Sequence, residues 1–214
     1  PIKLWKATHL VYQKRRMSHR TFCTFNPRKN SFNTERYTCH TIEEVDDMIE
    51  SASSAYPVIA SKTNQEINKL LRLIKEKLYS LKAKIASAYL KETGLTKERF
   101  DTEFNRTIFQ LELFSNHIIA PEYISTLNQT KKLNNKILTK KKIGIGPVLV
   151  LGASNFPLAY STIGGDSVAA LAAKNPVLVK SHPFHVGTSS VVFSAIQDAI
   201  YELNFPKGTF AHVI

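Results

Sequence analysis

The stretch GASNFPLAYSTIGGD, residues 152–166, contains Asn155, whose side chain is the strongest candidate in the sequence for a chemical role. A strand-like run, PVLVL, enters this stretch, and a small-residue helical pattern leaves it. Such a turn lies at the carboxyl edge of an open α/β sheet, where these folds bind ligands. The glycine fingerprint of an ordinary dinucleotide turn is missing. The Asn155 carboxamide could donate two hydrogen bonds to a ligand oxygen, or it could cap the following helix or support the turn.

Lys180 ends the next predicted strand at the same edge of the sheet. Its ammonium group suits ribose hydroxyls or a phosphate, and a solvent-facing lysine is the alternative. His182 and His185 follow at i, i+3 spacing. A metal site requires further inward-facing ligands, and the sequence indicates no third one. We expect this loop to be structural, with Pro183 stiffening it.

Two cysteines, Cys23 and Cys39, lie far in sequence from Asn155. No nucleophile–base arrangement surrounds either of them. A secreted disulfide scaffold of this size usually carries more cysteines. We therefore expect free thiols in a reducing compartment and a cytoplasmic protein.

The composition is that of a globular protein, with 43% hydrophobic and 10% aromatic residues in 214. No apolar run reaches the length of a membrane span, and residues 1–16 lack the apolar region of a secretory signal. The net charge of +12 is consistent with a lysine-rich solvated surface, a nucleic-acid ligand or a phosphorylated ligand. Residues 128–142 carry six lysines without aromatic residues for base stacking. We expect a linker or exposed strand there, and no nucleic-acid binding.

The pattern after residue 143 alternates between apolar strands and helices. Parallel strands with right-handed crossovers are expected from this order, and strands apolar on both faces indicate a sheet covered by helices. The chain is therefore predicted to be an α/β protein in which N-terminal helices and short strands (residues 1–142) lead into a partial doubly wound, Rossmann-like sheet (residues 143–214). The elements expected in the second part are strands 147–151, 177–180 and 209–214 and helices 162–173 and 188–203.

The first part contains recognisable start and stop signals. Residues 21–41 favour two short strands around an NPRKN turn. Capping boxes start helices at Thr41 and Thr63, and Gly94 suits the left-handed position after a helix that ends near Thr93. A further helix is expected from Thr96 to about residue 117.

Residues 146–189, GPVLVLGASNFPLAYSTIGGDSVAALAAKNPVLVKSHPFHVGTS, resemble the aldehyde dehydrogenase superfamily. They are similar to its strand, N-F-P turn, helix, second strand and following loop. The pieces TFNPRKN, TIEEVDDMIESASSAY, ETG and FPKGTFAHVI agree with the family in order. The forms GASNFP, GGD and KSHPFHVGTS are closest to the branch that oxidises α-ketoglutaric semialdehyde (2,5-dioxovalerate) and related aldehydes.

The resemblance implies a chemistry that this chain supplies only in part. Family members are about twice as long, and a cysteine thiolate attacks the aldehyde while a glutamate later activates water; both residues follow the region matched here. The resemblance assigns Asn155 as the catalytic donor to the tetrahedral oxyanion. The chain is therefore expected to be the N-terminal half of such an enzyme, truncated and inactive alone, acting on a small-molecule aldehyde and homo-oligomeric at full length.

The resemblance also implies cofactor contacts. The backbone of Leu151, Gly152, Ala153 and Ser154 would line the nicotinamide, and Lys180 would bind the adenosine ribose. Pro183 stands where many NAD-preferring members have a glutamate, while Ser181 and His182 can donate hydrogen bonds. This pattern favours NADP, with NAD also possible. A tyrosine or tryptophan often precedes the family's asparagine, whereas this chain has Ser154.

Two readings from other functional classes stay open on the sequence alone. The chain could be a non-catalytic binding or assembly module, which a compact oligomer in solution would favour. It could also be a basic nucleic-acid-binding protein, which would require salt-dependent affinity for DNA or RNA.

Overall fold

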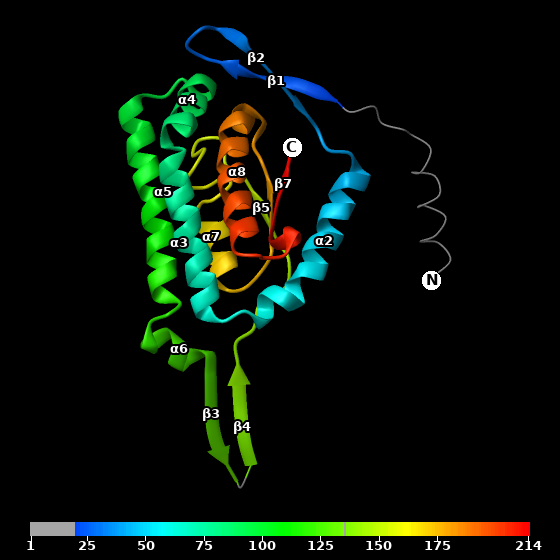
Figure 1. Cartoon of the computed structure of the whole chain (residues 1–214), viewed down its shortest axis with the longest axis vertical. Helices are drawn as coiled ribbons and strands as arrows, with labels where there is room; N and C mark the ends of the chain where they lie inside the picture. Colours follow the sequence, from blue (N-terminus) through cyan, green and yellow to red (C-terminus); the bar gives the residue numbers. More distant parts are fainter. Residues whose placement is uncertain (1–19, 135) are drawn as a thin grey trace, which may run out of the picture.

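The computed structural model describes residues 20–134 and 136–214 (Figure 1). Residues 1–16, in which the sequence indicates no secretory signal, lie outside the described residues. The helices are α2 (Ile42–Ser61), α3 (Asn64–Ser80), α4 (Lys82–Thr93), α5 (Lys97–His117), α6 (Pro121–Leu127), α7 (Gly165–Ala172) and α8 (Val186–Glu202). The strands are β1 (Thr21–Asn26), β2 (Ser31–Thr38), β3 (Asn128–Leu133), β4 (Lys136–Lys141), β5 (Val148–Leu151), β6 (Val177–Lys180) and β7 (Phe210–Val213).

The second part of the chain forms a three-stranded parallel sheet in the order β5-β6-β7. Val148 pairs with Val177, and Val177 pairs with Phe210. Helix α7 follows β5 and contacts it, and α8 follows β6 and contacts β7. The predicted alternation of strands and helices is therefore confirmed. Because the strands are parallel, their carboxyl ends share one edge of the sheet.

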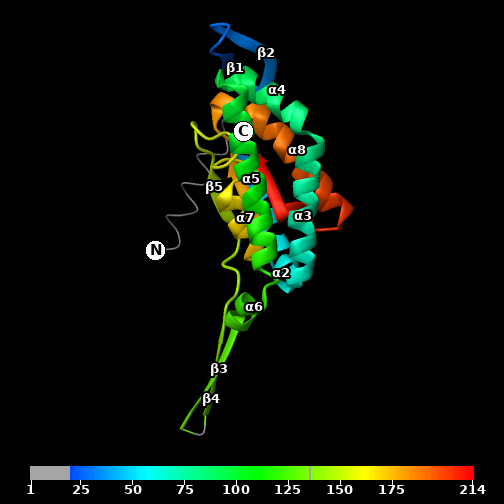
Figure 2. The ribbon, with the colours of Figure 1, turned by 90° about the vertical axis from the view of Figure 1, so that its left-hand side faces the viewer.

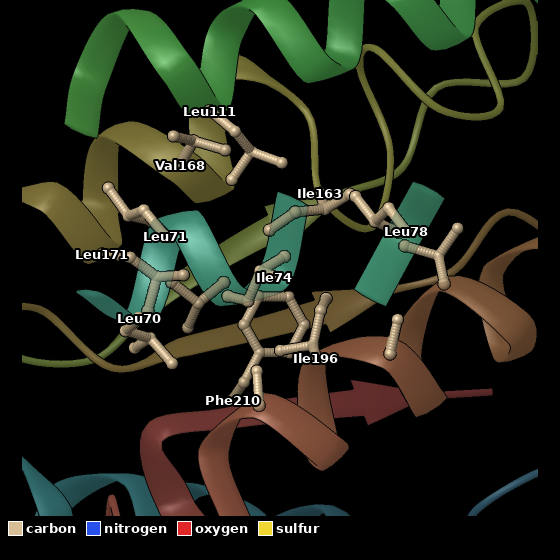
Figure 3. Close-up of a cluster of buried hydrophobic side chains, with 14 of the residues drawn as sticks. Leu70, Leu71, Ile74, Leu78, Leu111, Ile163, Val168, Leu171, Ile196 and Phe210 are labelled. Atoms are coloured by element: carbon tan, nitrogen blue, oxygen red, sulfur yellow. The ribbon is translucent and has the colours of Figure 1, made fainter. Parts of the chain in front are cut away.

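Helix α3 packs against α5, α7 and α8 in the hydrophobic core (Figure 3). Its spacing of apolar residues at i, i+3 and i+4 presents several aliphatic side chains inward. Burial of each such side chain contributes about 1.5–3 kcal/mol. The labelled members of this cluster are Leu70, Leu71, Ile74, Leu78, Leu111, Ile163, Val168, Leu171, Ile196 and Phe210.

The predicted helix signals take the expected geometry. Thr41 accepts a hydrogen bond from the backbone N–H of Glu44, and the Glu44 carboxylate accepts one from the backbone N–H of Thr41. Thr63 and Glu66 form the same reciprocal pair. Gly94 ends α4 in the left-handed conformation, with φ of 67°. Local sequence thus defines these helix ends.

Three details of the prediction are wrong. The helix expected up to Thr93 is divided at Leu81, where ψ is 6°; both parts contact α5 and α8, and α4 also contacts β1. Helix α7 begins at Gly165, later than expected. Strand β5 is not covered on both faces, because Leu149 and Leu151 are 63% and 70% exposed.

One of the two antiparallel hairpins packs against the body of the molecule, and the other extends from it. Hairpin β1–β2 contacts α4 and the 3-10 turn Pro183–His185. Hairpin β3–β4, in the lysine-rich segment, extends away from the body of the molecule (Figures 1 and 2). Ile137 and Leu138 of this hairpin are 72% and 53% exposed. The segment is therefore an exposed pair of strands, one of the two alternatives that its composition favours.

His212 is a buried titratable group on β7. It is 5% exposed, and its ring stacks on Phe193 with centroids 5.1 Å apart. Its Nε2 has no hydrogen-bond partner within the described part of the chain. Burial, with a smaller effect of nearby His40, lowers the pKa of His212 to about 4. The folded state therefore holds this ring neutral.

Acidification is expected to destabilise the fold through His212. The pKa is lower in the folded state than the ordinary value of 6.5, so this contribution is complete above pH 6.5 and is lost as pH falls toward 4. The shift corresponds to about 3 kcal/mol at about 1.4 kcal/mol per pKa unit. Urea unfolding at several pH values should show a shallower decline for His212→Gln than for the unsubstituted chain. Parallel declines would contradict this assignment, and His117→Gln, at an exposed site, is the control.

Candidate active site

The residues from the end of β5 to the start of α7 form an irregular loop with Asn155 exposed near its tip. The backbone N–H of Gly152 donates to the carbonyl of Lys180 at 3.0 Å, which ties the base of the loop to the end of β6. The N–H of Ala153 donates to the carbonyl of Tyr160 at 2.8 Å and closes the loop on itself. The structure therefore brings Asn155 and Lys180 to the same carboxyl edge, as predicted from their positions after parallel strands.

His185 holds the incoming side of this loop from beneath. Its Nε2 lies 2.8 Å from the carbonyl oxygen of Ala153, and the ring is fully buried. Burial lowers the pKa of His185, which favours the neutral ring. Nε2 then carries the proton and donates to Ala153, while Nδ1 faces the Ser189 hydroxyl at 3.4 Å. The expectation that this histidine loop is structural agrees with these contacts.

Glu103 holds the outgoing side of the loop. Its Oε1 accepts hydrogen bonds from the backbone N–H groups of Leu158 and Ala159, at 2.8 and 3.0 Å. Its Oε2 accepts one from the Tyr89 hydroxyl at 2.8 Å. The carboxylate is 2% exposed. Sequence reasoning missed this residue, although its place between the inward-facing Phe100 and Ile108 on α5 is an available signal, because a charge on a buried face needs partners.

Glu92 is a second buried carboxylate that sequence reasoning did not assign to the site. It accepts hydrogen bonds from the backbone N–H groups of Gly187 and Thr188 and from the Thr188 hydroxyl, each at 2.7 Å. These groups belong to the first turn of α8, where a helix has free N–H donors. Burial raises the pKa of Glu92. The last turn of α4 is thereby fastened to α8, just beyond the loop that follows Lys180.

A cavity of about 340 Å³ opens beside Asn155. Hairpin β1–β2, the end of α4, the Asn155 loop and the turn at His185 together form its walls. The lining is mainly apolar, with the amide of Asn155 and the carboxylate of Glu92 among its polar groups. The lining residues are Phe25, Pro27, Glu92, Thr93, Leu95, Ser154, Asn155, Phe184 and His185. A mainly apolar, partly open cavity with an exposed amide suits a small molecule that presents an oxygen.

The predicted cofactor residues differ in what they can offer a ligand. Lys180 and Pro183 are exposed, and His182 is half-buried, with Nδ1 accepting from the N–H of Phe184. Ser181 is 1% exposed, and its hydroxyl donates to the carbonyl of Val213 at 3.1 Å. The Ser181 hydroxyl is thus used inside the sheet. Leu151 and Ser154 are exposed, and Gly152 and Ala153 are half-buried along the same edge.

The model of the aldehyde dehydrogenase family matches residues 14–214. The chain belongs to this family. Two curated aldehyde dehydrogenases show the similarity in sequence. An alpha-ketoglutaric semialdehyde dehydrogenase of Acinetobacter baylyi is 38% identical over 79% of this chain and 33% of its own length. Alpha-ketoglutaric semialdehyde dehydrogenase 2 of Azospirillum brasilense is 41% identical over 58% of this chain and 24% of its own length. The matched region therefore spans about a third or less of these relatives.

Solved aldehyde dehydrogenase structures share the fold. Glyceraldehyde-3-phosphate dehydrogenase GapN of Methanocaldococcus jannaschii, whose structure contains NADP, superposes with a TM-score of 0.78 at 15% identity. The superposition covers 92% of this chain and 41% of that one. The predicted α/β class is confirmed.

The thiols of this aldehyde dehydrogenase chain lie apart from the cavity lining. Cys23 on β1 and Cys39 after β2 are both free, as predicted, and both are half-buried. Neither is among the residues that line the cavity at Asn155. Within residues 20–134 and 136–214, no three metal-binding side chains converge. None of the helices described there is long and apolar enough to cross a bilayer.

Two arginines on α5 flank the residue after Asn155. The guanidinium carbon of Arg99 lies 4.5 Å from the centroid of the Phe156 ring, and that of Arg106 lies 6.0 Å from it. Arg106 also lies 4.8 Å from the Tyr160 ring centroid and donates to the Tyr160 hydroxyl. No salt bridge to either guanidinium forms among the described residues. Positive charge is thus concentrated beside the Asn155 loop.

Proposed function

We propose that this chain is the N-terminal part of an NAD(P)-dependent aldehyde dehydrogenase that oxidises a carboxylate-bearing semialdehyde such as 2,5-dioxovalerate. The observation that carries the proposal is the exposed carboxamide of Asn155 at the mouth of an apolar cavity, on a loop fastened at both sides by buried side chains. A rigid, partly desolvated donor is what stabilises charge developing on a carbonyl oxygen. The names of the curated relatives support the choice of substrate.

Asn155 would act on the substrate oxygen. When a nucleophile adds to the aldehyde carbon, negative charge forms on that oxygen, and the Nδ2–H group of Asn155 donates to it. Phe25, Leu95 and Phe184 give this side of the cavity apolar walls, and a lower local dielectric would strengthen the hydrogen bond. Neither cysteine of this sequence lines the cavity, so we propose that the attacking thiolate and the general base come from outside these 214 residues.

The exposed residues at the end of β6 fit a nicotinamide dinucleotide. Lys180 presents an ammonium group, and Pro183 places no carboxylate near it that would repel a 2′-phosphate. We therefore propose NADP as the cofactor, with NAD as an alternative. Lys180 would hold the ribose, His182 would face the phosphate, and the backbone from Leu151 to Ser154 would border the nicotinamide. A nicotinamide held by these residues would supply the hydride acceptor for the oxidation.

We propose that the complete enzyme is a homo-oligomer. Hairpin β3–β4 extends from the body and exposes Ile137 and Leu138, which supports a contact with another copy. The six lysines of the segment, without interleaved aromatic residues, do not support nucleic-acid binding.

Turnover with matched substrates tests the proposed function. The complete enzyme should reduce NADP with 2,5-dioxovalerate, and the 214-residue chain alone should not. We propose that Arg106, which is exposed beside the Asn155 loop but outside the cavity lining, binds the substrate carboxylate. Arg106→Met should then lower kcat/KM for 2,5-dioxovalerate by about 10- to 100-fold, since a hydrogen bond to a charged group contributes about 1.5–3 kcal/mol. It should leave an uncharged aldehyde of the same length unaffected.

Arg72→Met is the matched control, because Arg72 is exposed on α3 and bonds Asn116. Absence of turnover by the complete enzyme with every aldehyde would refute the function. Equal effects of Arg106→Met on charged and uncharged aldehydes would refute only the substrate class.

A further inference from the structure

Glu103 connects helix α5 to the Asn155 loop across 55 positions of sequence. Its Oε1 accepts from the N–H groups of Leu158 and Ala159, which follow Asn155 by three and four residues. The loop between β5 and α7 contains no regular secondary structure, and while several of its N–H groups bond backbone carbonyls, those of Leu158 and Ala159 bond a side-chain acceptor instead. Glu103 supplies one acceptor oxygen for both of them.

Only two residues separate Asn155 from Leu158, the nearer of the two residues whose N–H groups bond Glu103. Ala153 and Tyr160 are joined by a backbone hydrogen bond, so the chain from 153 to 160 is a loop with Asn155 near its tip. His185 fixes the carbonyl of Ala153 on one side, and Glu103 fixes Leu158 and Ala159 on the other. The position of the tip relative to the helices therefore depends on these two attachments.

Comparison with Glu92 shows why Glu103 does more than join two elements. Both carboxylates are buried, and each accepts from two successive N–H groups and one hydroxyl. Glu92 bonds the first turn of α8, which its own helical hydrogen bonds keep in shape. Glu103 bonds an irregular loop, whose shape is set by such attachments.

We propose that Glu103 is a positioning residue for the carboxamide of Asn155. This inference rests on the proposed function, in which that carboxamide donates to the reacting oxygen. The length of the Glu103 side chain places Oε1 within hydrogen-bonding distance of both N–H groups. A displacement of about 1 Å at a reacting group can cost about 100-fold in rate.

Two conservative variants separate the effect of side-chain length from the effect of side-chain charge. Glu103→Asp keeps the charge and shortens the side chain by about 1.5 Å. Glu103→Gln keeps the length, and its carbonyl oxygen can accept both N–H bonds. In the complete enzyme, Glu103→Asp should lower kcat by about 10- to 100-fold with little change in KM for aldehyde or NADP. Glu103→Gln should stay within about 5-fold of the unsubstituted enzyme.

Tyr89→Phe is the matched control. It removes the donor to Oε2 and leaves both bonds from Oε1 to the loop. Its kcat should therefore remain within about 3-fold, even if its stability falls. A decline in kcat that follows stability across the three variants, rather than side-chain length, would overturn the proposal.

A readout independent of turnover uses the 214-residue chain. In Glu103→Asp, the amide protons of Leu158 and Ala159 should exchange with solvent at least about 10-fold faster, and the side-chain amide NMR signals of Asn155 should shift. Neither change should occur in Tyr89→Phe. Unchanged exchange and unchanged Asn155 signals in Glu103→Asp would overturn the proposal. Because these signals do not require catalysis, they decide the role of Glu103 even if the complete enzyme oxidises no aldehyde.

Discussion

Replacement of Asn155 by alanine is expected to lower kcat of the complete enzyme by about 100- to 1,000-fold. The variant removes a side-chain donor that would stabilise the oxyanion, and loss of one such donor typically costs about 3–4 kcal/mol of transition-state stabilisation. Asn155 is exposed on its loop and has no hydrogen bond to another described side chain, so the fold should tolerate the change. Steady-state kinetics and the dissociation constant for NADP measure the two consequences separately.

The contrast between a large change in kcat and a small change in NADP affinity would identify Asn155 as an oxyanion donor. The affinity for NADP should change little, because the proposed ribose contact lies on Lys180. Asn155→Asp should be at least as impaired as the alanine variant, since an ionised carboxylate accepts but cannot donate. Asn105→Ala, at an exposed position on α5, is the matched control. An unchanged kcat in Asn155→Ala would refute the oxyanion role.

Replacement of Gly164 by alanine is expected to destabilise the chain by about 3 kcal/mol, at the upper end of the range for overpacked sites. An added Cβ would lie 2.1 Å from the carbonyl oxygen and 2.5 Å from the carbonyl carbon of Ala159. These are backbone atoms of the residue that Glu103 holds, so the loop would have to move. Urea unfolding measures the loss, and kcat should fall because the same movement displaces Asn155.

The neighbouring glycine provides a control with the same chemical change. At Gly165 the nearest atom to an added Cβ is Oε1 of Gln110, at 3.2 Å, and this end of a flexible side chain can move. Gly165→Ala should therefore change stability by less than about 0.5 kcal/mol. Equal effects at the two glycines would show that the close approach at Gly164 is not rigid.

Much of the local structure could be predicted from residue order. The capping pairs at Thr41 and Thr63, the left-handed Gly94 and the three parallel strands follow from interactions within a few residues or from a repeating apolar pattern. The placement of Asn155 and Lys180 at one edge follows from the same pattern, because parallel strands end together.

Other features depend on contacts that no local pattern contains. The division of the long helix at Leu81 has no glycine or proline to mark it. The exposure of Leu149 and Leu151 depends on what lies beside β5. The apolar sequence pattern of a strand is the same whether or not other elements cover it. Ser181 looked available as a donor, but its hydroxyl bonds the carbonyl of Val213.

The sequence by itself determined that Asn155 and Lys180 would stand at one carboxyl edge of the parallel sheet. Only the tertiary structure showed what holds that amide in place: Glu103 from α5 on one side of the loop and His185 on the other. The physical reason is that the N–H groups of Leu158 and Ala159 have no backbone acceptor and need a partner from outside this irregular loop. Its partners come from segments tens of residues away, and folding alone brings them together.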